Sequence, residues 1–105
     1  MTKILITGAH GFIGKHLSKF FAAKGHLVMG LGHGSWMREE ALSWGIQEWL
    51  DGDINQDNLR ILQERGKPEL VFHLAGGSTV GAAIKNPYED FLRTVQSSIE
   101  LLEWI

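Results

Sequence analysis

Three glycines recur at every third position near the start of the chain, between a short apolar run and a helical pattern. The segment over residues 3–21 reads KILITGAHGFIGKHLSKFF, and its glycines stand at 8, 11 and 14. The run before them predicts a buried strand, and apolar residues at helical spacing from Phe12 onward predict an amphipathic helix. A strand that turns sharply into a helix needs a residue without a Cβ, and Gly8 supplies it. The chain is therefore predicted to begin with a strand, a tight turn and a helix.

The rest of the sequence repeats this alternation of strand and helix. We predict strands over 3–7, 26–32, 46–50 and 69–75, and helices from Phe12 to Gly25 and over 37–45, 55–66 and 86–105. Such an order is typical of an α/β fold with a Rossmann-type, doubly wound parallel sheet. Right-handed crossovers give the strand order 3-2-1-4, with a ligand-binding switch point between the first and fourth strands.

The glycine turn also predicts a binding site for a dinucleotide. Gly11 lets the backbone approach a pyrophosphate, Gly14 lets the helix pack closely, and the helix N-terminus offers free N–H groups. The spacing excludes a P-loop, because five residues separate Gly8 from Gly14 and His16 follows Lys15. The alternative is an ordinary tight connection that binds nothing.

Length and composition limit the chain to one domain over residues 1–105. It is 44% hydrophobic and 21% charged and has no cysteine, which excludes disulfides and thiolate metal sites. No apolar run approaches the ~18 residues of a membrane span, and no signal peptide opens the chain, so we expect a cytoplasmic protein without a membrane partner. Residues 1–38 contain no Asp or Glu, which suits an anionic ligand, although chance clustering is the alternative.

Four motifs resemble those of the extended short-chain dehydrogenase/reductase family, which includes NAD-dependent epimerases and dehydratases. TGAHGFIG (7–14) has the family's glycine spacing, and GDI (52–54) is similar to the turn after its third strand. FHLAGG (72–77) is similar to the segment that ends its fourth strand, and residues 86–103 resemble the helix that follows. The likeness covers the whole chain but only the N-terminal part of a family member.

The resemblance implies a set of cofactor-binding residues. Asp53 would accept a hydrogen bond from the adenine amino group, the backbone of Ile54 would complete that contact, and the end of the fourth strand would line the nicotinamide side. The residues that we expect at the cofactor are Gly8, Gly11, Phe12, Ile13, Gly14, His33, Asp53, Ile54, Leu74, Ala75 and Gly76.

The cofactor is expected to be NAD or NADP, with a lean to NADP. Family members that prefer NAD carry an acidic residue at the end of the second strand, for the ribose hydroxyls. Here Gly32 stands at that point, and the first carboxylate after it is Glu39. A 2′-phosphate would meet no repulsion, and His33 or Arg38 could approach it. The alternative is that both side chains are solvated and that the site accepts either cofactor.

The family's catalytic tyrosine, with a lysine four residues later, is missing from the sequence. Tyr88 is its single tyrosine, and Leu92 stands four residues after it. We therefore expect no catalytic residue here, but the cofactor-binding part of an NAD(P)-dependent nucleotide-sugar epimerase, dehydratase or reductase. The fourth strand would have no neighbouring strand on its outer side, and the apolar last helix has no Gly, Asn or Pro to end it. Both features favour the N-terminal portion of a longer enzyme, which stops before a fifth strand. The alternative is a non-catalytic NAD(P)-binding regulatory module.

The histidines and tryptophans of the sequence indicate neither a metal site nor a nucleic-acid site. His10 is expected to face solvent, and because no carboxylate stands near it or His16, we expect no metal site. Tryptophans at 36, 44 and 49 lack interleaved Lys and Arg. We therefore expect them to pack between the second helix and the third strand rather than to bind nucleic acid.

The last predicted helix has apolar residues on more than one face, which indicates burial on two sides. One stripe, widened by Leu101, Trp104 and Ile105, consists of Tyr88, Phe91, Leu92, Val95, Ile99 and Leu102. We expect one face to cover the sheet. The other face would contact a second copy of the chain in a homodimer, as the resemblance implies, or would be covered by a missing C-terminal half.

Overall fold

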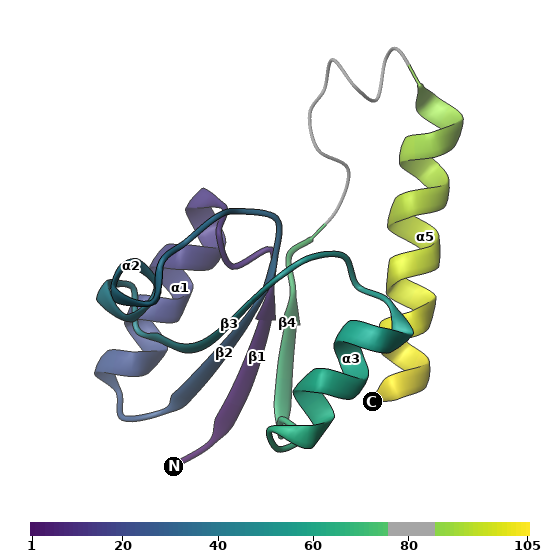
Figure 1. Ribbon diagram of the computed structural model, residues 1–105. Coiled ribbons are helices and arrows are strands. Elements are labelled where there is room, and N and C mark those ends of the chain that lie inside the picture. Colours follow the sequence, from purple (N-terminus) through teal and green to yellow (C-terminus); the bar gives the residue numbers. More distant parts are fainter. Residues whose placement is uncertain (76–85) are drawn as a thin grey trace.

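Figure 1 shows the chain as a computed structural model, which describes residues 1–75 and 86–105. Its parallel sheet contains β1 (Lys3–Thr7), β2 (Leu27–Gly32), β3 (Ile46–Asp51) and β4 (Leu70–His73), in the order β3-β2-β1-β4. The helices are α1 (Phe12–Ala23), α2 (Arg38–Ser43), α3 (Gln56–Glu64) and α5 (Pro87–Trp104). The predicted Rossmann-type topology and strand order are confirmed.

The two faces of the sheet bury alternate residues of the same strands, because successive side chains of a strand point to opposite sides. Ile4 and Ile6 belong to a core cluster under α1 and α2. Leu5 belongs to a second cluster, which Leu59 of α3 and Leu101 of α5 complete. Figure 1 accordingly shows α1 and α2 on one side of the sheet and α3 and α5 on the other.

β4 is shorter than the predicted 69–75, and Thr7 of β1 explains its end. The N–H groups of Leu74 and Ala75 donate to the Thr7 side-chain oxygen, Oγ1, at 3.1 and 3.2 Å. The Leu74 N–H also donates to the Thr7 main-chain carbonyl at 3.2 Å and is shared between the two acceptors, whereas the Ala75 N–H bonds to the hydroxyl. The backbone ladder therefore ends at Leu74. The hydroxyl of Thr7 thus fixes the point at which the chain leaves the sheet.

α5 buries less of its apolar surface than the sequence predicts. Leu101 is 2% exposed and Trp104 packs against the core, but Tyr88, Phe91 and Leu102 are 73%, 60% and 71% exposed. The predicted stripe therefore faces outward. Of the residues that widen it, Leu101 and Trp104 contact the core, whereas Ile105 is 59% exposed. None of the helices that the structure describes is both long and apolar enough to cross a lipid bilayer.

The tryptophans divide between two neighbourhoods. Trp36 and Trp49 lie against each other with ring centroids 5.1 Å apart, as their predicted packing at the third strand requires. Trp44 also contacts α1. Its ring centroid lies 5.0 Å from that of His16, and the Lys15 ammonium lies over the ring, 4.8 Å from the centroid. All three tryptophans nevertheless pack against one core cluster, which includes Ala41 of α2 and Ile46 of β3, as predicted.

Candidate functional site

The turn between β1 and α1 brings glycine backbones into contact. Gly8 has a φ of +70°, and a Cβ there would lie 2.9 Å from the backbone of Leu74 and of Ala75. The N–H of Gly11 donates to the carbonyl oxygen of Gly8 at 3.0 Å. A Cβ on Gly14 would collide with that same carbonyl. Side chains at positions 8 and 14 are therefore incompatible with this turn.

The N-terminus of α1 offers backbone donors to an anion. It has no side-chain cap and no acidic residue in its first turn. The N–H of Lys15 donates to the Gly11 carbonyl at 2.9 Å, and the amides before it lie too early in the helix to have intrahelical acceptors. The helix dipole adds a partial positive charge at this end. Phosphates bind readily to such a terminus.

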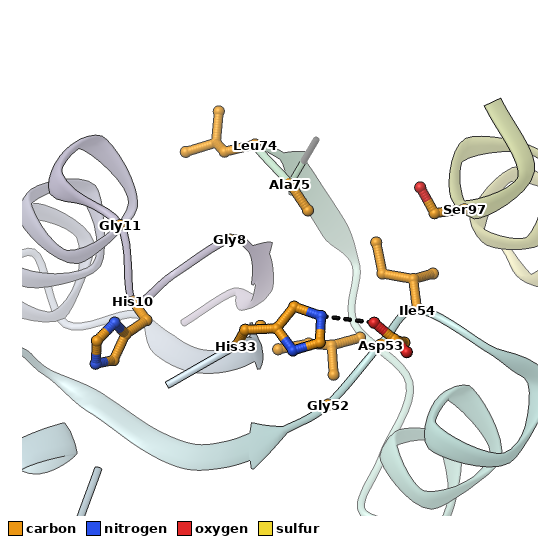
Figure 2. Close-up of a pocket in the computed structure, with 12 residues that line it drawn as sticks. Gly8, His10, Gly11, His33, Gly52, Asp53, Ile54, Leu74, Ala75 and Ser97 are labelled. Carbon is orange, nitrogen blue, oxygen red and sulfur yellow. Dashed lines mark ion pairs between the residues drawn. The ribbon is translucent and has the colours of Figure 1, made fainter. Parts of the chain in front are cut away.

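A cleft of about 370 Å³ opens at the carboxyl ends of the strands, where ligands bind in open α/β sheets. Its volume falls within the range of small-molecule sites. Figure 2 shows the glycine turn on one wall and α5 on the opposite wall. The lining residues are Gly8, His10, Gly11, Leu31, Gly32, His33, Gly52, Asp53, Ile54, Leu74, Ala75 and Ser97.

The cleft gathers many of the residues that the sequence places at the cofactor. Those that line it are Gly8, Gly11, His33, Asp53, Ile54, Leu74 and Ala75. Phe12, Ile13 and Gly14 do not line it; they form the first turn of α1, with the Phe12 and Ile13 side chains exposed. A contact of these two residues with phosphate would use their backbone N–H groups. Gly76 lies outside the described residues.

An ion pair crosses one end of the cleft. The His33 ring nitrogen Nε2 lies 2.5 Å from the Asp53 carboxylate oxygen Oδ1, which joins the loop after β2 to the loop after β3 (Figure 2). Both side chains are largely exposed. Because an exposed ion pair contributes about 0–1 kcal/mol, a ligand can displace it at little cost. A Cβ at neighbouring Gly32 would make ordinary contacts at 3.4 Å or more, so that position has room for a side chain.

His10 lines the cleft instead of facing solvent as predicted. Its ring centroid lies 4.4 Å from that of Trp36 and 6.0 Å from that of Trp49. Its imidazole fills the space beside Gly34, where a Cβ would collide with the ring. No local sequence pattern indicates this packing, because Gly34 and Trp36 lie more than 20 residues from His10 along the chain.

The loop after β2 is fastened to β3 beside that cluster. The Gly34 N–H donates to Asp51 Oδ1 at 3.1 Å, and the Gly34 carbonyl accepts from the Trp49 indole N–H at 3.1 Å. Both bonds anchor the segment that carries His33. The wall of the cleft at the end of β2 is therefore held by two side chains of β3 that bond to the Gly34 backbone.

His73, at the end of β4, connects three elements behind the cleft. Its Nδ1 lies 2.7 Å from Thr7 Oγ1, and its Nε2 lies 3.0 Å from Ser98 Oγ on α5. Burial lowers the pKa of His73 below its ordinary value of 6.5, because desolvation disfavours the charged imidazolium. Neighbouring Ser97, which the sequence analysis did not select, lines the cleft.

The structure gives no support for a metal centre in the part of the chain that it describes. Within residues 1–75 and 86–105, no three or more His, Asp or Glu side chains are grouped to hold a metal ion.

Parallel strands whose carboxyl ends open onto a glycine turn define the fold as one of the Rossmann class. A family model described as the NAD dependent epimerase/dehydratase family matches residues 4–105. The chain belongs to this family.

Individual relatives are longer proteins. The UDP-glucose 4-epimerase of Mycolicibacterium smegmatis is 35% identical over 105 residues, which are 96% of this chain and 34% of that protein. The CDP-paratose 2-epimerase of Salmonella typhi is 34% identical over 107 residues, with 96% of this chain and 32% of the relative covered. The chain thus spans about a third of the length of these relatives.

Solved structures share the same arrangement. UDP-glucose 4-epimerase from Brucella ovis, in complex with NAD, superimposes with a TM-score of 0.80 at 28% identity, covering 99% of this chain and 32% of that one. The enzyme from Thermotoga maritima, with UDP-glucose, gives a TM-score of 0.82 at 28% identity, covering 97% and 33%.

Proposed function

We propose that the chain is the cofactor-binding part of an NAD(P)-dependent enzyme that acts on a nucleotide sugar, as an epimerase, dehydratase or reductase. The observation that carries this proposal is the glycine turn, which lines the cleft with Gly8 and Gly11 and leads directly into the uncapped N-terminus of α1. Relatives named as nucleotide-sugar epimerases support the substrate class.

In this proposal each wall of the cleft holds one part of the dinucleotide. The turn from Gly8 to Gly11 and the first amides of α1 bind the pyrophosphate. Asp53 and the backbone of Ile54 hold the adenine, and Leu74, with Ala75, lies at the nicotinamide. The bound cofactor supplies hydride transfer, while these residues orient it and exclude water from one of its faces.

In the proposed enzyme, proton transfer would be made by residues that the present sequence does not contain. The sequence contains no tyrosine with a lysine four residues later, and Leu92 stands four residues after Tyr88. Tyr88 is 73% exposed near the start of α5 and does not line the cleft. A regulatory module that binds NAD(P) without catalysis is the second candidate, because the same missing pair is compatible with it.

We further propose that the site prefers NADP to NAD. β2 ends on Gly32, so no carboxylate at that position repels a 2′-phosphate, and the His33 imidazole lies in the same wall of the cleft. The NAD bound to the Brucella ovis enzyme is the observation against this preference. The residue at the end of β2 is therefore the position at which this preference can be tested.

The exposed stripe of α5 supports a proposal of homodimerisation. Phe91, Ile99 and Leu102 are each at least 50% exposed. A second copy of the same helix would bury these side chains, and a symmetric contact of this kind is the commonest form of association.

Replacing Gly11 with valine tests the proposed cofactor site. A Cβ at Gly11 would lie 3.3 Å from the Gly8 carbonyl, a close contact but not a collision, and a branched side chain would cover the amides that receive the pyrophosphate. We expect NAD⁺ and NADP⁺ to bind more than tenfold more weakly in calorimetric titrations, a loss of at least about 1.4 kcal/mol.

Ala23→Val is the matched control, because it adds the same branched group at the exposed far end of α1. It should bind both cofactors like the unaltered protein. Undiminished affinity in the Gly11→Val protein, with its circular dichroism spectrum preserved, would show that the phosphates bind elsewhere.

A further inference from the structure

Both ring nitrogens of His73 are engaged in hydrogen bonds, and the partners on each side determine which nitrogen carries the proton. A neutral imidazole donates from one nitrogen and accepts at the other. The partners of His73 are hydroxyl groups, Thr7 on β1 and Ser98 on α5, and each hydroxyl has one hydrogen and two lone pairs. The other hydrogen bonds of the two hydroxyl groups therefore determine which atom donates in each bond to His73.

The Thr7 side assigns Nδ1 as the acceptor. The Thr7 oxygen Oγ1 already accepts from the N–H groups of Leu74 and Ala75, at 3.1 and 3.2 Å. The Leu74 N–H is shared with the Thr7 main-chain carbonyl at 3.2 Å. Two N–H groups nevertheless face the lone pairs of Oγ1, so the hydroxyl hydrogen points to His73 Nδ1, 2.7 Å away. A proton on Nδ1 would instead place two hydrogens between the same pair of atoms.

The Ser98 side leads independently to the same assignment. The Ser98 hydroxyl donates to the carbonyl oxygen of Thr94 in the preceding turn of α5 at 2.8 Å. Its hydrogen is thereby used, and its oxygen is left to accept from His73 Nε2 at 3.0 Å. The proton of the neutral ring must therefore lie on Nε2.

We propose that His73 is a positioning residue of the cofactor cleft: a neutral imidazole, protonated on Nε2, that ties α5 to the ends of β1 and β4. The resulting chain of bonds runs from the amides of Leu74 and Ala75 through Thr7 and His73 to Ser98. Leu74 and Ala75 form one wall of the cleft, and Ser97, next to Ser98, lies on the opposite wall (Figure 2). His73 thus sets the distance between the two walls.

The attachments of α5 show why this single bond matters. Near its C-terminal end, Leu101 and Trp104 pack against the core. Toward its start, Tyr88, Phe91 and Leu92 are exposed. Among the side chains that the structure describes, the bond from His73 to Ser98 is the hydrogen bond that joins α5 to another element. It holds the middle of the helix, at the level of the cleft.

Nitrogen NMR of the imidazole tests the assigned tautomer directly. Long-range proton–nitrogen correlations distinguish the two neutral tautomers and the imidazolium. At neutral pH we expect His73 to show the pattern of a ring protonated on Nε2 alone. A ring protonated on Nδ1, or a charged ring, would overturn the proposal.

Two substitutions separate the two bonds of the ring. His73→Asn retains an acceptor near the position of Nδ1 but does not reach Ser98, whereas His73→Gln retains a donor near the position of Nε2. Hydrogen exchange of the α5 amides, measured without cofactor, should become about two- to tenfold faster in His73→Asn, the range that one net hydrogen bond supplies. In His73→Gln it should stay near the rate of the unaltered protein.

Ser98→Ala provides a second route to the same result, since it removes the partner hydroxyl on α5. It should accelerate exchange as much as His73→Asn, and the double variant should exchange no faster than either alone. Equal exchange in His73→Asn and His73→Gln, or additive effects in the double variant, would refute the tether.

The role of the tether at the cleft rests on the proposed cofactor function, and titration with NAD⁺ or NADP⁺ measures it separately. Ser98→Ala should weaken binding of the preferred cofactor about two- to tenfold. Failure of the unaltered protein to bind either cofactor would reject the proposed function but leave the hydrogen-exchange result standing. Unchanged affinity in Ser98→Ala, with faster exchange, would reject His73 as a positioning residue of the cleft.

Discussion

Gly14 shows how a single absent methyl group shapes the turn beside the cleft. Its ideal Cβ would collide with the Gly8 carbonyl oxygen and lie 2.7 Å from Ala9 Cα. Both obstacles belong to the backbone, so no change of side-chain rotamer can relieve them. At Gly11 the nearest atom would be 3.3 Å away. Position 11 therefore has more room for a Cβ than position 14, although both belong to one motif.

Gly14→Ala should therefore destabilise the protein by about 1–3 kcal/mol, the usual cost of forcing extra atoms into a packed site. Gly11→Ala, the matched control, should change the free energy of unfolding by less than about 1 kcal/mol. Urea denaturation monitored by tryptophan fluorescence would measure both values. Equal stabilities of the two variants would contradict the steric explanation.

The buried position of His73 predicts how stability depends on pH. Because burial lowers its pKa in the folded protein, the unfolded chain binds this proton more readily. The contribution of His73 to stability is therefore complete above pH 6.5 and declines as the pH falls below 6.5 toward the folded-state pKa. As the pH falls below 6.5, the free energy of unfolding of His73→Asn should therefore decrease less than that of the unaltered protein. Parallel slopes in urea unfolding experiments would contradict this expectation.

The end of β2 is the element that governs the proposed cofactor preference. The strand closes on Gly32, whose added Cβ would make ordinary contacts at 3.4 Å or more, so a larger residue fits. Gly32→Asp would place a carboxylate where the ribose of the adenosine is expected. We predict that NADP⁺ binds this variant at least tenfold more weakly, by repulsion of its 2′-phosphate.

Gly32→Asn is the matched control, because it has nearly the same size without the charge. It should keep the cofactor preference of the unaltered protein. Calorimetric titration of all three proteins with NAD⁺ and NADP⁺ provides the comparison. If the unaltered protein already binds NAD⁺ more tightly, the proposed preference for NADP is wrong.

Local pattern was sufficient to predict the helices and strands on both sides of the glycine turn. The run before Gly8 and the spacing of apolar residues after Phe12 are properties of consecutive residues, and both elements form as expected. The length of β4 could not be predicted in this way. It depends on the hydroxyl of Thr7, which lies 66 residues from His73 along the chain.

The contents of the cleft were predictable only in part, for the same reason. Gly8 follows from the glycine spacing after the first strand, and Asp53 follows from the resemblance of GDI (52–54) to a family motif. His10 and Ser97 do not, since one depends on Trp36 and Gly34 and the other on the docking of α5. Residues placed by distant partners carry no periodic signal in a single sequence.

The outward-facing stripe of α5 leads to a prediction about the whole molecule. If two copies associate through this stripe, Phe91→Glu should convert the dimer to a monomer, because it would bury a charge without a partner. Phe20→Glu is the matched control, as Phe20 is also an exposed aromatic residue, 54% accessible on α1. Light scattering would give both masses. A Phe91→Glu protein with the mass of a dimer would exclude this interface.

The central place of β1 has a consequence for how the chain acquires its structure during synthesis. β1 pairs with β2 through Lys3 and Leu27, but its other neighbour, β4, begins only at Leu70. A nascent chain can assemble the first three strands while one border of β1 still lacks its partner. During that interval the border is open to wrong pairing with other chains. This edge of β1 is therefore protected only after β4 has been synthesised and has paired with it.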